Sequence, residues 1–299
     1  MTTQLQRYRV AVAGGDLAVT RWGEADHIVL AAHGITASHQ AWATLADTLP
    51  DDLSLIAPDL RGRGDSTALP GPYGMAQHAS DLAAVLDDAR ADRAVLVGHS
   101  MGGFVMAAFA TLFPGRTEGV VLVDGGPALG DPLPDDVDID AVLAQVIGPA
   151  MDRLARRFAT AEEYRRFWLE HPAFRDSDVD PDRIAAYADH DLHGPDGDLR
   201  SKVSADAVRA DARDSLINDD VRSAVADIAV PAVLVLAERG MLDGPEPLYH
   251  ADAVDGLATQ TGPLEIVRVP DSNHYTVCMG PAGAAVIAQQ VRRLAGEGG

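Results

Sequence analysis

Six short, continuously apolar runs recur along this chain, and they constrain its fold more than any other feature. The runs are HIVLAAHG, LSLIAPDL, RAVLVGHS, GVVLVDGG, AVLVLAERG and LEIVRVPD. Such a run is expected of a strand that helices cover on both faces. Helical patterns lie between the runs, over about residues 38–49, 75–90, 101–113 and 281–295. Strands that alternate with helices predict an α/β fold with a parallel sheet and right-handed crossovers.

The alternation is broken in two places. Near the start, RYRVAVAGGDLAVTRWG predicts two strands around a Gly14-Gly15-Asp16 turn, an antiparallel hairpin that makes the sheet mixed. From about Pro127 to Asp227 there is no strongly apolar strand run, but there are several amphipathic helical patterns. Because sheet strands resume afterwards, we expect a core domain over 1–126 and 228–299, with a helical cap at 127–227 inserted into it.

Charge and composition argue against several function classes. The formal net charge of −21 and the sequence pI near 4.6 argue against nucleic acid or an anionic membrane surface as a partner. The one cysteine, Cys278, can form no internal disulfide and lacks partners for a zinc cluster, so no metal is expected. No apolar stretch approaches membrane-spanning length. We expect a cytoplasmic protein, monomer or homodimer, that takes a small-molecule substrate.

One glycine-rich segment carries a candidate nucleophile. Gly98-His99-Ser100-Met101-Gly102 fits the pattern G-x-S-x-G. A serine on a sharp strand-to-helix turn has a strained backbone and crowded flanks, which is why small residues surround it. The turn also leaves the Met101 N–H at a helix N-terminus, where it can hold a developing oxyanion. By itself the pentapeptide fits a well-packed bend equally well, so its meaning depends on its partners.

Two further segments supply those partners. HGITAS follows the strand predicted at residues 28–32, and the N–H of Ile35 would be the second oxyanion donor. In VPDSNHYT, His274 follows the last predicted strand, at the edge where open parallel sheets place their sites. Its imidazole could take the proton of Ser100 and return it to a leaving group.

With these three segments, the chain resembles the α/β-hydrolase superfamily over essentially its whole length. DLRGRGDS, residues 59–66, is similar to that family's Asp-x-x-Gly-x-Gly-x-Ser turn. We interpret it as structural, with Asp59, Arg61 and Ser66 pinning the loop through hydrogen bonds. The resemblance implies an eight-stranded sheet, a cap inserted after strand six, and a Ser–acid–His triad that needs no cofactor.

The acid of the triad is left open. In most relatives it follows strand seven in a Gly-x-x-Asp pattern, but in LVLAERGMLDG the aligned positions are Ala237 and Gly240. Asp124 stands at the tip of strand six, where some members of the superfamily carry the acid, including certain lactone-cleaving hydrolases and some haloalkane dehalogenases. We favour Asp124, with Asp243 as the alternative and Glu238 third.

The residues that line a substrate pocket are less well marked. Phe167 and Trp168 are adjacent in the cap, so at most one of them is expected to face a given pocket, and Trp168 is our candidate. Five cap arginines are interpreted mainly as a solvated helical face: Arg153, Arg156, Arg157, Arg165 and Arg166.

A serine nucleophile fits acyl transfer, whereas the resemblance implies an aspartate at this position for halide displacement or epoxide opening. We predict a hydrolase of a carboxylic ester or lactone, with Ser100 as nucleophile and His274 as general base and then acid. Ile35 and Met101 would hold the oxyanion. The second hypothesis is carbon–carbon hydrolysis of a diketone, which a polar or cationic cap surface facing Ser100 would favour. The third is a small-molecule receptor on the same scaffold.

Overall fold

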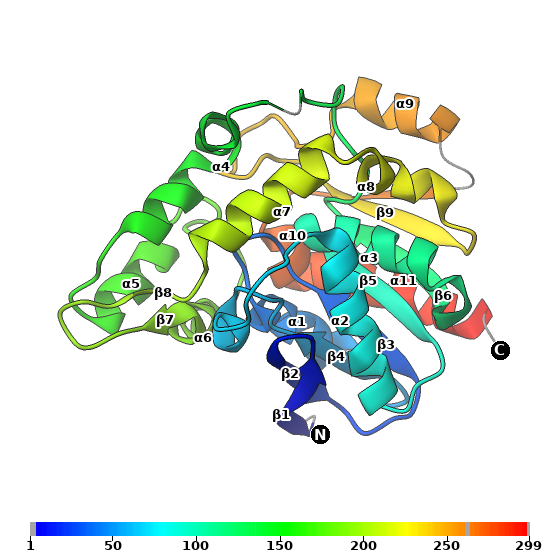
Figure 1. Cartoon of the computed structure of the whole chain (residues 1–299), viewed down its shortest axis with the longest axis horizontal. Coiled ribbons are helices and arrows are strands. Elements are labelled where there is room, and N and C mark those ends of the chain that lie inside the picture. Colours follow the sequence, from blue (N-terminus) through cyan, green and yellow to red (C-terminus); the bar gives the residue numbers. More distant parts are fainter. Residues whose placement is uncertain (1–3, 135, 261–263, 298–299) are drawn as a thin grey trace.

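Each apolar run of the sequence forms a strand of one eight-stranded sheet, ordered β1-β2-β4-β3-β5-β6-β9-β10 (Figure 1). The computed structural model describes residues 4–134, 136–260 and 264–297. The strands are β1 Leu5–Val12, β2 Gly15–Trp22, β3 Ile28–Ala32, β4 Ser54–Pro58, β5 Ala94–His99, β6 Thr117–Val123, β9 Ala232–Ala237 and β10 Leu264–Val269. The pairs β1–β2 and β2–β4 are antiparallel and the other pairs are parallel. The predicted mostly parallel, eight-stranded sheet is therefore confirmed.

Helices cover both faces of the middle of this sheet, which explains why β3, β4, β5, β6 and β9 are buried almost throughout. Alternate side chains of β3 point to opposite faces: Leu30 joins the apolar cluster that contains α2 (Met75–Asp88) and α3 (Met101–Leu112). Val29 joins the cluster on the other face, which contains α1 (Ala43–Thr48), α10 (Thr276–Met279) and α11 (Pro281–Glu297). A strand in this position has no solvent-facing side and so shows no polar alternation.

The chain between β6 and β9 is helical. It contains α4 Ile139–Ala155, α5 Ala161–Leu169, α6 Pro181–Asp191, the short pair β7 Leu192–His193 and β8 Arg200–Ser201, α7 Ala205–Ile217 and α8 Asp219–Ser223. Figure 1 shows α4, α5 and α6 grouped to one side of the sheet, with α7 leading back toward α3. Near the end of this inserted segment, Val221 and Val225 pack into the apolar cluster that contains α3. Its division from the core at 127–227 remains a prediction.

The remaining helices are α9 Ala251–Gln260 and four 3₁₀ turns, η1 His39–Trp42, η2 Gly64–Ser66, η3 Pro114–Arg116 and η4 Ala224–Asp227. Across the described ranges of the chain, no helix is both long and apolar enough to cross a membrane.

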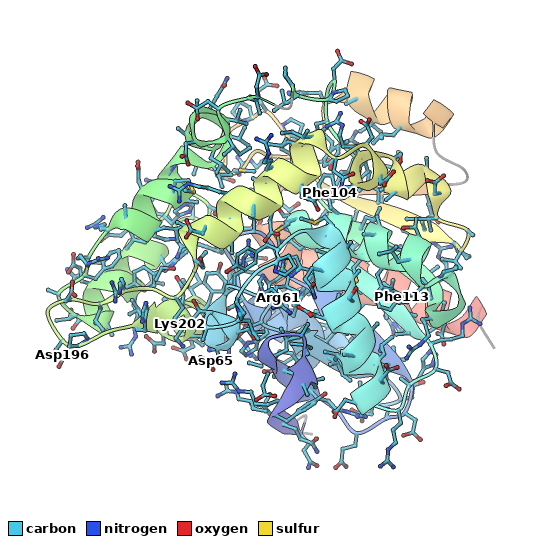
Figure 2. All side chains as sticks on the ribbon, viewed as in Figure 1. Arg61, Asp65, Phe104, Phe113, Asp196 and Lys202 are labelled. Carbon is cyan, nitrogen blue, oxygen red and sulfur yellow. The ribbon has the colours of Figure 1, made fainter. Side chains whose placement is uncertain are left out.

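The Asp59–Ser66 turn fastens this inserted segment to the core. Asp59 accepts the backbone N–H groups of His39 and Asp65, each at 2.9 Å, which confirms its expected role in pinning the loop. His190 of α6 lies 2.7 Å from the same carboxylate. Lys202 donates to Asp65 at 2.7 Å, and Figure 2 shows these two side chains side by side.

A sharp turn joins β5 to α3 and positions Ser100. The serine has φ +54° and ψ −122°, a conformation that L-residues rarely adopt. A Cβ on Gly102 would lie 2.0 Å from the carbonyl oxygen of Ala32, and one on Gly125 would lie 2.2 Å from that of Ser100. Backbone therefore occupies the space that side chains would need, and only glycine fits at either position.

Gly102→Ala should destabilise the fold, because the obstacle is rigid backbone. We expect the free energy of unfolding to fall by roughly 2–3 kcal/mol, the range of an overpacked core site. Gly115→Ala is the control, since nothing lies within 4 Å of the Cβ it would add, and it should change stability by less than about 0.5 kcal/mol. Urea unfolding of both variants measures the difference, and equal stabilities would contradict the steric argument.

Candidate active site

Ser100, Asp124 and His274 gather at the carboxyl ends of three strands. Ser100 follows β5, Asp124 follows β6, and His274 lies between β10 and α10. The His274 Nδ1 atom is 2.7 Å from Asp124 Oδ2, and Asp124 has no exposed surface. Ser100 and His274 line the same cavity, although no hydrogen bond joins them among the described contacts. The structure thus brings together the three residues that the sequence singled out.

The carboxylate of Asp124 is held from two sides. Its backbone has φ +45°, and its N–H donates to the carbonyl oxygen of Val235 at 2.8 Å. The N–H of Ala237 donates to Oδ1 at 3.2 Å, which leaves Oδ2 for the imidazole. Because a carboxylate only accepts hydrogen bonds, His274 donates from Nδ1, and in the neutral ring Nε2 is then the acceptor. This is the tautomer that a general base requires.

The alternative acids have other partners. Arg239 Nη1 lies 3.1 Å from both carboxylate oxygens of Asp243, and Asn273 Nδ2 donates to Oδ1, also at 3.1 Å. Glu238 accepts the backbone N–H of Asp271 at 3.3 Å. The structure therefore brings His274 to Asp124. Asp243 instead binds Asn273, the residue before His274, and so supports the loop that carries the histidine.

His99, the variable position of the G-x-S-x-G pattern, also contacts this site. Its Nε2 lies 2.8 Å from the backbone carbonyl oxygen of His274, so this nitrogen is the donor. Burial and the neighbouring His274 hold the pKa of His99 well below its ordinary value, which keeps the ring neutral. The sequence pattern specifies no residue here, so its positioning role was not predicted.

The loop that carries Ile35 is oriented by a second buried histidine. His33 Nδ1 is 2.8 Å from the Gly34 carbonyl oxygen, and its Nε2 accepts the N–H of Leu60 at 2.9 Å. The Gly34 carbonyl also accepts the N–H of Ala37 at 3.1 Å. In a trans peptide the N–H points opposite to the carbonyl, so these bonds orient the Ile35 N–H. Burial lowers the pKa of His33 to about 3, consistent with a neutral ring.

Arg63 contacts both predicted oxyanion residues. Its Nε donates to the carbonyl oxygen of Ile35 at 3.0 Å, and its Nη2 lies 3.8 Å from the sulfur of Met101. Its charge is neutralised by Asp211 of α7. Burial opposes ionisation of this carboxyl, but Arg63 and His78 outweigh it and bring the pKa of Asp211 to about 2. The inserted segment thereby supplies the counterion for a residue that holds the loop of residues 33–37, the predicted oxyanion loop.

Arg153 departs from the expectation of a solvated face. It is 2% exposed, pairs with Asp191 and Tyr164, and lies over the ring of Trp168. Its Nη2 donates to the carbonyl oxygen of Thr36 at 3.0 Å, so it also supports the oxyanion loop. The other four arginines of that group have half-exposed side chains and pair with surface carboxylates, as expected: Arg156, Arg157, Arg165 and Arg166.

Two cavities adjoin Ser100, and Trp168 lines neither of them. Its indole is 2% exposed and packs edge-on against Tyr164, Tyr187 and Tyr275. The structure therefore does not bring the predicted substrate-binding residue to the site. Tyr187 and Tyr275, which contact Trp168, line the smaller cavity instead. The spacing of residues along a helix does not tell which aromatic side chains face Ser100 and which pack behind them.

One cluster in the described part of the chain has donors placed for a metal ion. These are His39, Asp59 and His190, whose donor atoms lie within 4.8 Å of one another. The two imidazole nitrogens are 2.8 and 2.7 Å from the oxygens of Asp59, so each histidine is already hydrogen-bonded to the carboxylate. We assign the cluster the structural role of joining α6 to the core.

Comparison with known proteins places this geometry in a family. A family model described as alpha/beta hydrolase fold matches residues 27–276, most of the chain. The chain belongs to the alpha/beta hydrolase family. The lipase LipV of Mycobacterium tuberculosis is 34% identical over 195 residues, which cover 64% of this chain and 69% of that protein.

A 2-(acetamidomethylene)succinate hydrolase of Mesorhizobium japonicum is 27% identical over 248 residues, 83% of this chain and 81% of that one. The crystal structure of an E-2-(acetamidomethylene)succinate hydrolase superposes with a TM-score of 0.79 at 23% identity, covering 97% of this chain and 99% of the other. The family and these relatives support a hydrolase.

Asp124→Asn should lower kcat by roughly 10³–10⁴-fold, because an amide in place of the carboxylate favours the wrong tautomer of His274. Asp243→Asn, which removes a carboxylate bound to Arg239 and Asn273, should reduce kcat by less than about tenfold. Circular dichroism of both variants controls for folding. The reverse order of the two effects would assign the acid to Asp243.

The buried neutral His33 predicts a loss of stability on acidification. Its pKa is about 3 in the folded state and 6.5 in the unfolded state, so below pH 6.5 the unfolded chain binds a proton that the folded chain does not. Between pH 7 and pH 5 the uptake of this proton by the unfolded chain should lower the free energy of unfolding by about 2 kcal/mol. His33→Asn, which does not titrate, should show a pH dependence weaker by that amount in urea unfolding. An unchanged pH dependence would mean that His33 is not buried neutral.

Proposed function

We propose that this protein hydrolyses a carboxylic ester or lactone through an acyl-enzyme on Ser100. The observation that carries the proposal is the combination of the His274–Asp124 pair with a largely apolar cavity beside the serine. That cavity is lined mainly by aliphatic and aromatic side chains from α3, α4, α7 and the loops after β6 and β9. Its one cationic residue, Arg222, donates to the carbonyl oxygens of Leu216 and Gly130.

The first half-reaction transfers the acyl group to the enzyme. Ser100 Oγ attacks the ester carbonyl carbon, and its proton passes to His274 Nε2. The carbonyl oxygen becomes an oxyanion that accepts hydrogen bonds from the N–H groups of Ile35 and Met101. Met101 is the first residue of α3, so its N–H has no partner within the helix. When the carbon–oxygen bond breaks, the imidazolium returns the proton to the departing alkoxide.

The second half-reaction regenerates the serine. His274 takes a proton from water, the hydroxide attacks the acyl carbon, and the same two N–H groups stabilise the second oxyanion. Collapse releases a carboxylic acid, and His274 returns the proton to Ser100. For a lactone, the alcohol and the acid are parts of one ring-opened product. Every proton transfer uses the Nε2 atom that the Asp124 contact leaves unprotonated.

The cavity walls bear on the competing hypotheses. A diketone substrate would be favoured by polar or cationic groups facing Ser100, and the larger cavity offers few of them. A receptor with a vestigial site would retain the scaffold without turnover. An ester hydrolase therefore fits the walls better than carbon–carbon hydrolysis does, and turnover distinguishes it from a receptor.

A fluorophosphonate should label Ser100 covalently, because its phosphorus is attacked by the same activated hydroxyl. Intact-protein mass spectrometry should show one adduct per chain, with peptide mapping placing it on Ser100, and none in Ser100→Ala. The purified enzyme is then assayed on a panel of alkyl esters, lactones and vinylogous diketones. Labelling together with turnover of esters or lactones supports the proposal. Turnover of diketones alone, or of no substrate, would overturn it.

A further inference from the structure

The two cavities beside Ser100 differ in size and share a boundary. The larger has a volume of about 160 Å³ and the smaller about 50 Å³. Four residues line both of them: Ile35, Ser100, Ile147 and Met241. A substrate bonded to Ser100 therefore has two different spaces into which its two halves can extend.

A kink in α4 separates the two spaces. Ile147 has φ −131° and ψ +31°, outside the helical range, and Pro149 follows two residues later. A proline inside a helix removes one backbone hydrogen bond and kinks the chain. On either side of the kink, Val146 lines only the larger cavity and Ala150 only the smaller one. One helix thus contributes a wall to each space.

The position of His274 decides which half of the substrate lies in which cavity. In the proposed mechanism the imidazole protonates the departing alkoxide, so the alcohol half must extend on the His274 side. His274 lines the smaller cavity and not the larger. The acyl half must then extend away from the imidazole, past Met101, which lines only the larger cavity.

The walls of the larger cavity define the acyl group that it accepts. Most of its lining side chains are apolar, and they include Phe104 of α3, Leu143 and Val146 of α4, Leu216 of α7, and Leu129 and Leu248 from the loops after β6 and β9. Because burying a methylene against such a surface is favourable, each added carbon should strengthen binding by about fourfold while space remains. The smaller cavity offers no comparable room.

We infer that the substrate is an ester of an apolar, extended acyl chain with a small alcohol. Val146 would limit the length of the acyl half, and Ala150 would limit the length of the alcohol half. This inference rests on the proposed ester hydrolysis and adds the orientation of the substrate. It makes the kinked α4 the element that determines specificity.

Two series of esters measured by pH-stat test this orientation. One series varies the acid from butanoate to decanoate as methyl esters, and the other varies the alcohol of butanoate from methyl to hexyl. In wild type, kcat/KM should rise with acyl length and fall with alcohol length. Val146→Phe should lower kcat/KM for the longest acyl chains by at least about tenfold and keep the wild-type order among alcohols. Ala150→Phe should lower kcat/KM for esters of long alcohols by a similar factor and keep the wild-type order among acids.

Ala144→Phe is the matched control, because Ala144 is an exposed residue of α4 that lines neither cavity, and both profiles should stay as in wild type. Val146→Leu and Ala150→Leu serve as smaller steps if a phenylalanine variant does not fold. A Val146 variant that penalises alcohols, or variants that shift both series alike, would overturn the orientation but leave ester hydrolysis standing. A wild-type enzyme that labels with fluorophosphonate and turns over no ester would overturn the proposed function and this inference together.

Discussion

The arrangement of the site depends on direct backbone contact around Ser100. The Ser100 N–H donates to the carbonyl oxygen of Val123 at 2.9 Å, which ties the turn to the strand whose end carries Asp124. On its other side the turn packs Gly102 against the carbonyl of Ala32, where β3 ends and the oxyanion loop begins. One tightly packed turn therefore fixes the spacing of Ser100, Met101 and the ends of β3 and β6. A side chain at Gly102 would separate all of them at once.

The oxyanion loop depends in addition on buried charge. Arg63 and Arg153 donate to consecutive carbonyls of this loop, and their counterions Asp211 and Asp191 lie in the inserted segment. Removing one partner of such a pair leaves an uncompensated buried charge, at a cost of about 3–5 kcal/mol. The helices α6 and α7 are therefore part of the scaffold that shapes the site. Within the described part of the inserted segment, Ile147 at the kink of α4 is the one residue that lines both cavities.

Much of the fold, and part of the candidate site, could be predicted from local sequence. The strands are recognisable because burial on both faces requires uninterrupted apolar runs, and Ser100 and His274 because each follows such a run. Arg153 and Trp168 could not be placed, because their surroundings are set by distant partners. Arg153 meets Thr36, 117 residues earlier in the chain. A helical pattern with arginines at its end gives no sign that one of them will be buried against a carbonyl.

The sequence alone did not decide between Asp124 and Asp243. The register of the sheet explains which of them reaches His274. Val123 of β6 pairs with Val235 of β9, and just beyond this pair the N–H of Ala237 donates to Asp124 Oδ1 while Oδ2 contacts His274. The strand after which the resemblance places the acid, β9, thus supplies a peptide hydrogen bond here. An aspartate would not fit at position 240, because a Cβ on Gly240 would lie 2.4 Å from the carbonyl oxygen of Glu246. The loop after β9 is instead closed by its own backbone hydrogen bonds, from Gly240 to Gly244 and from Asp243 to Gly240, and the carboxylate that contacts His274 is the one that follows β6.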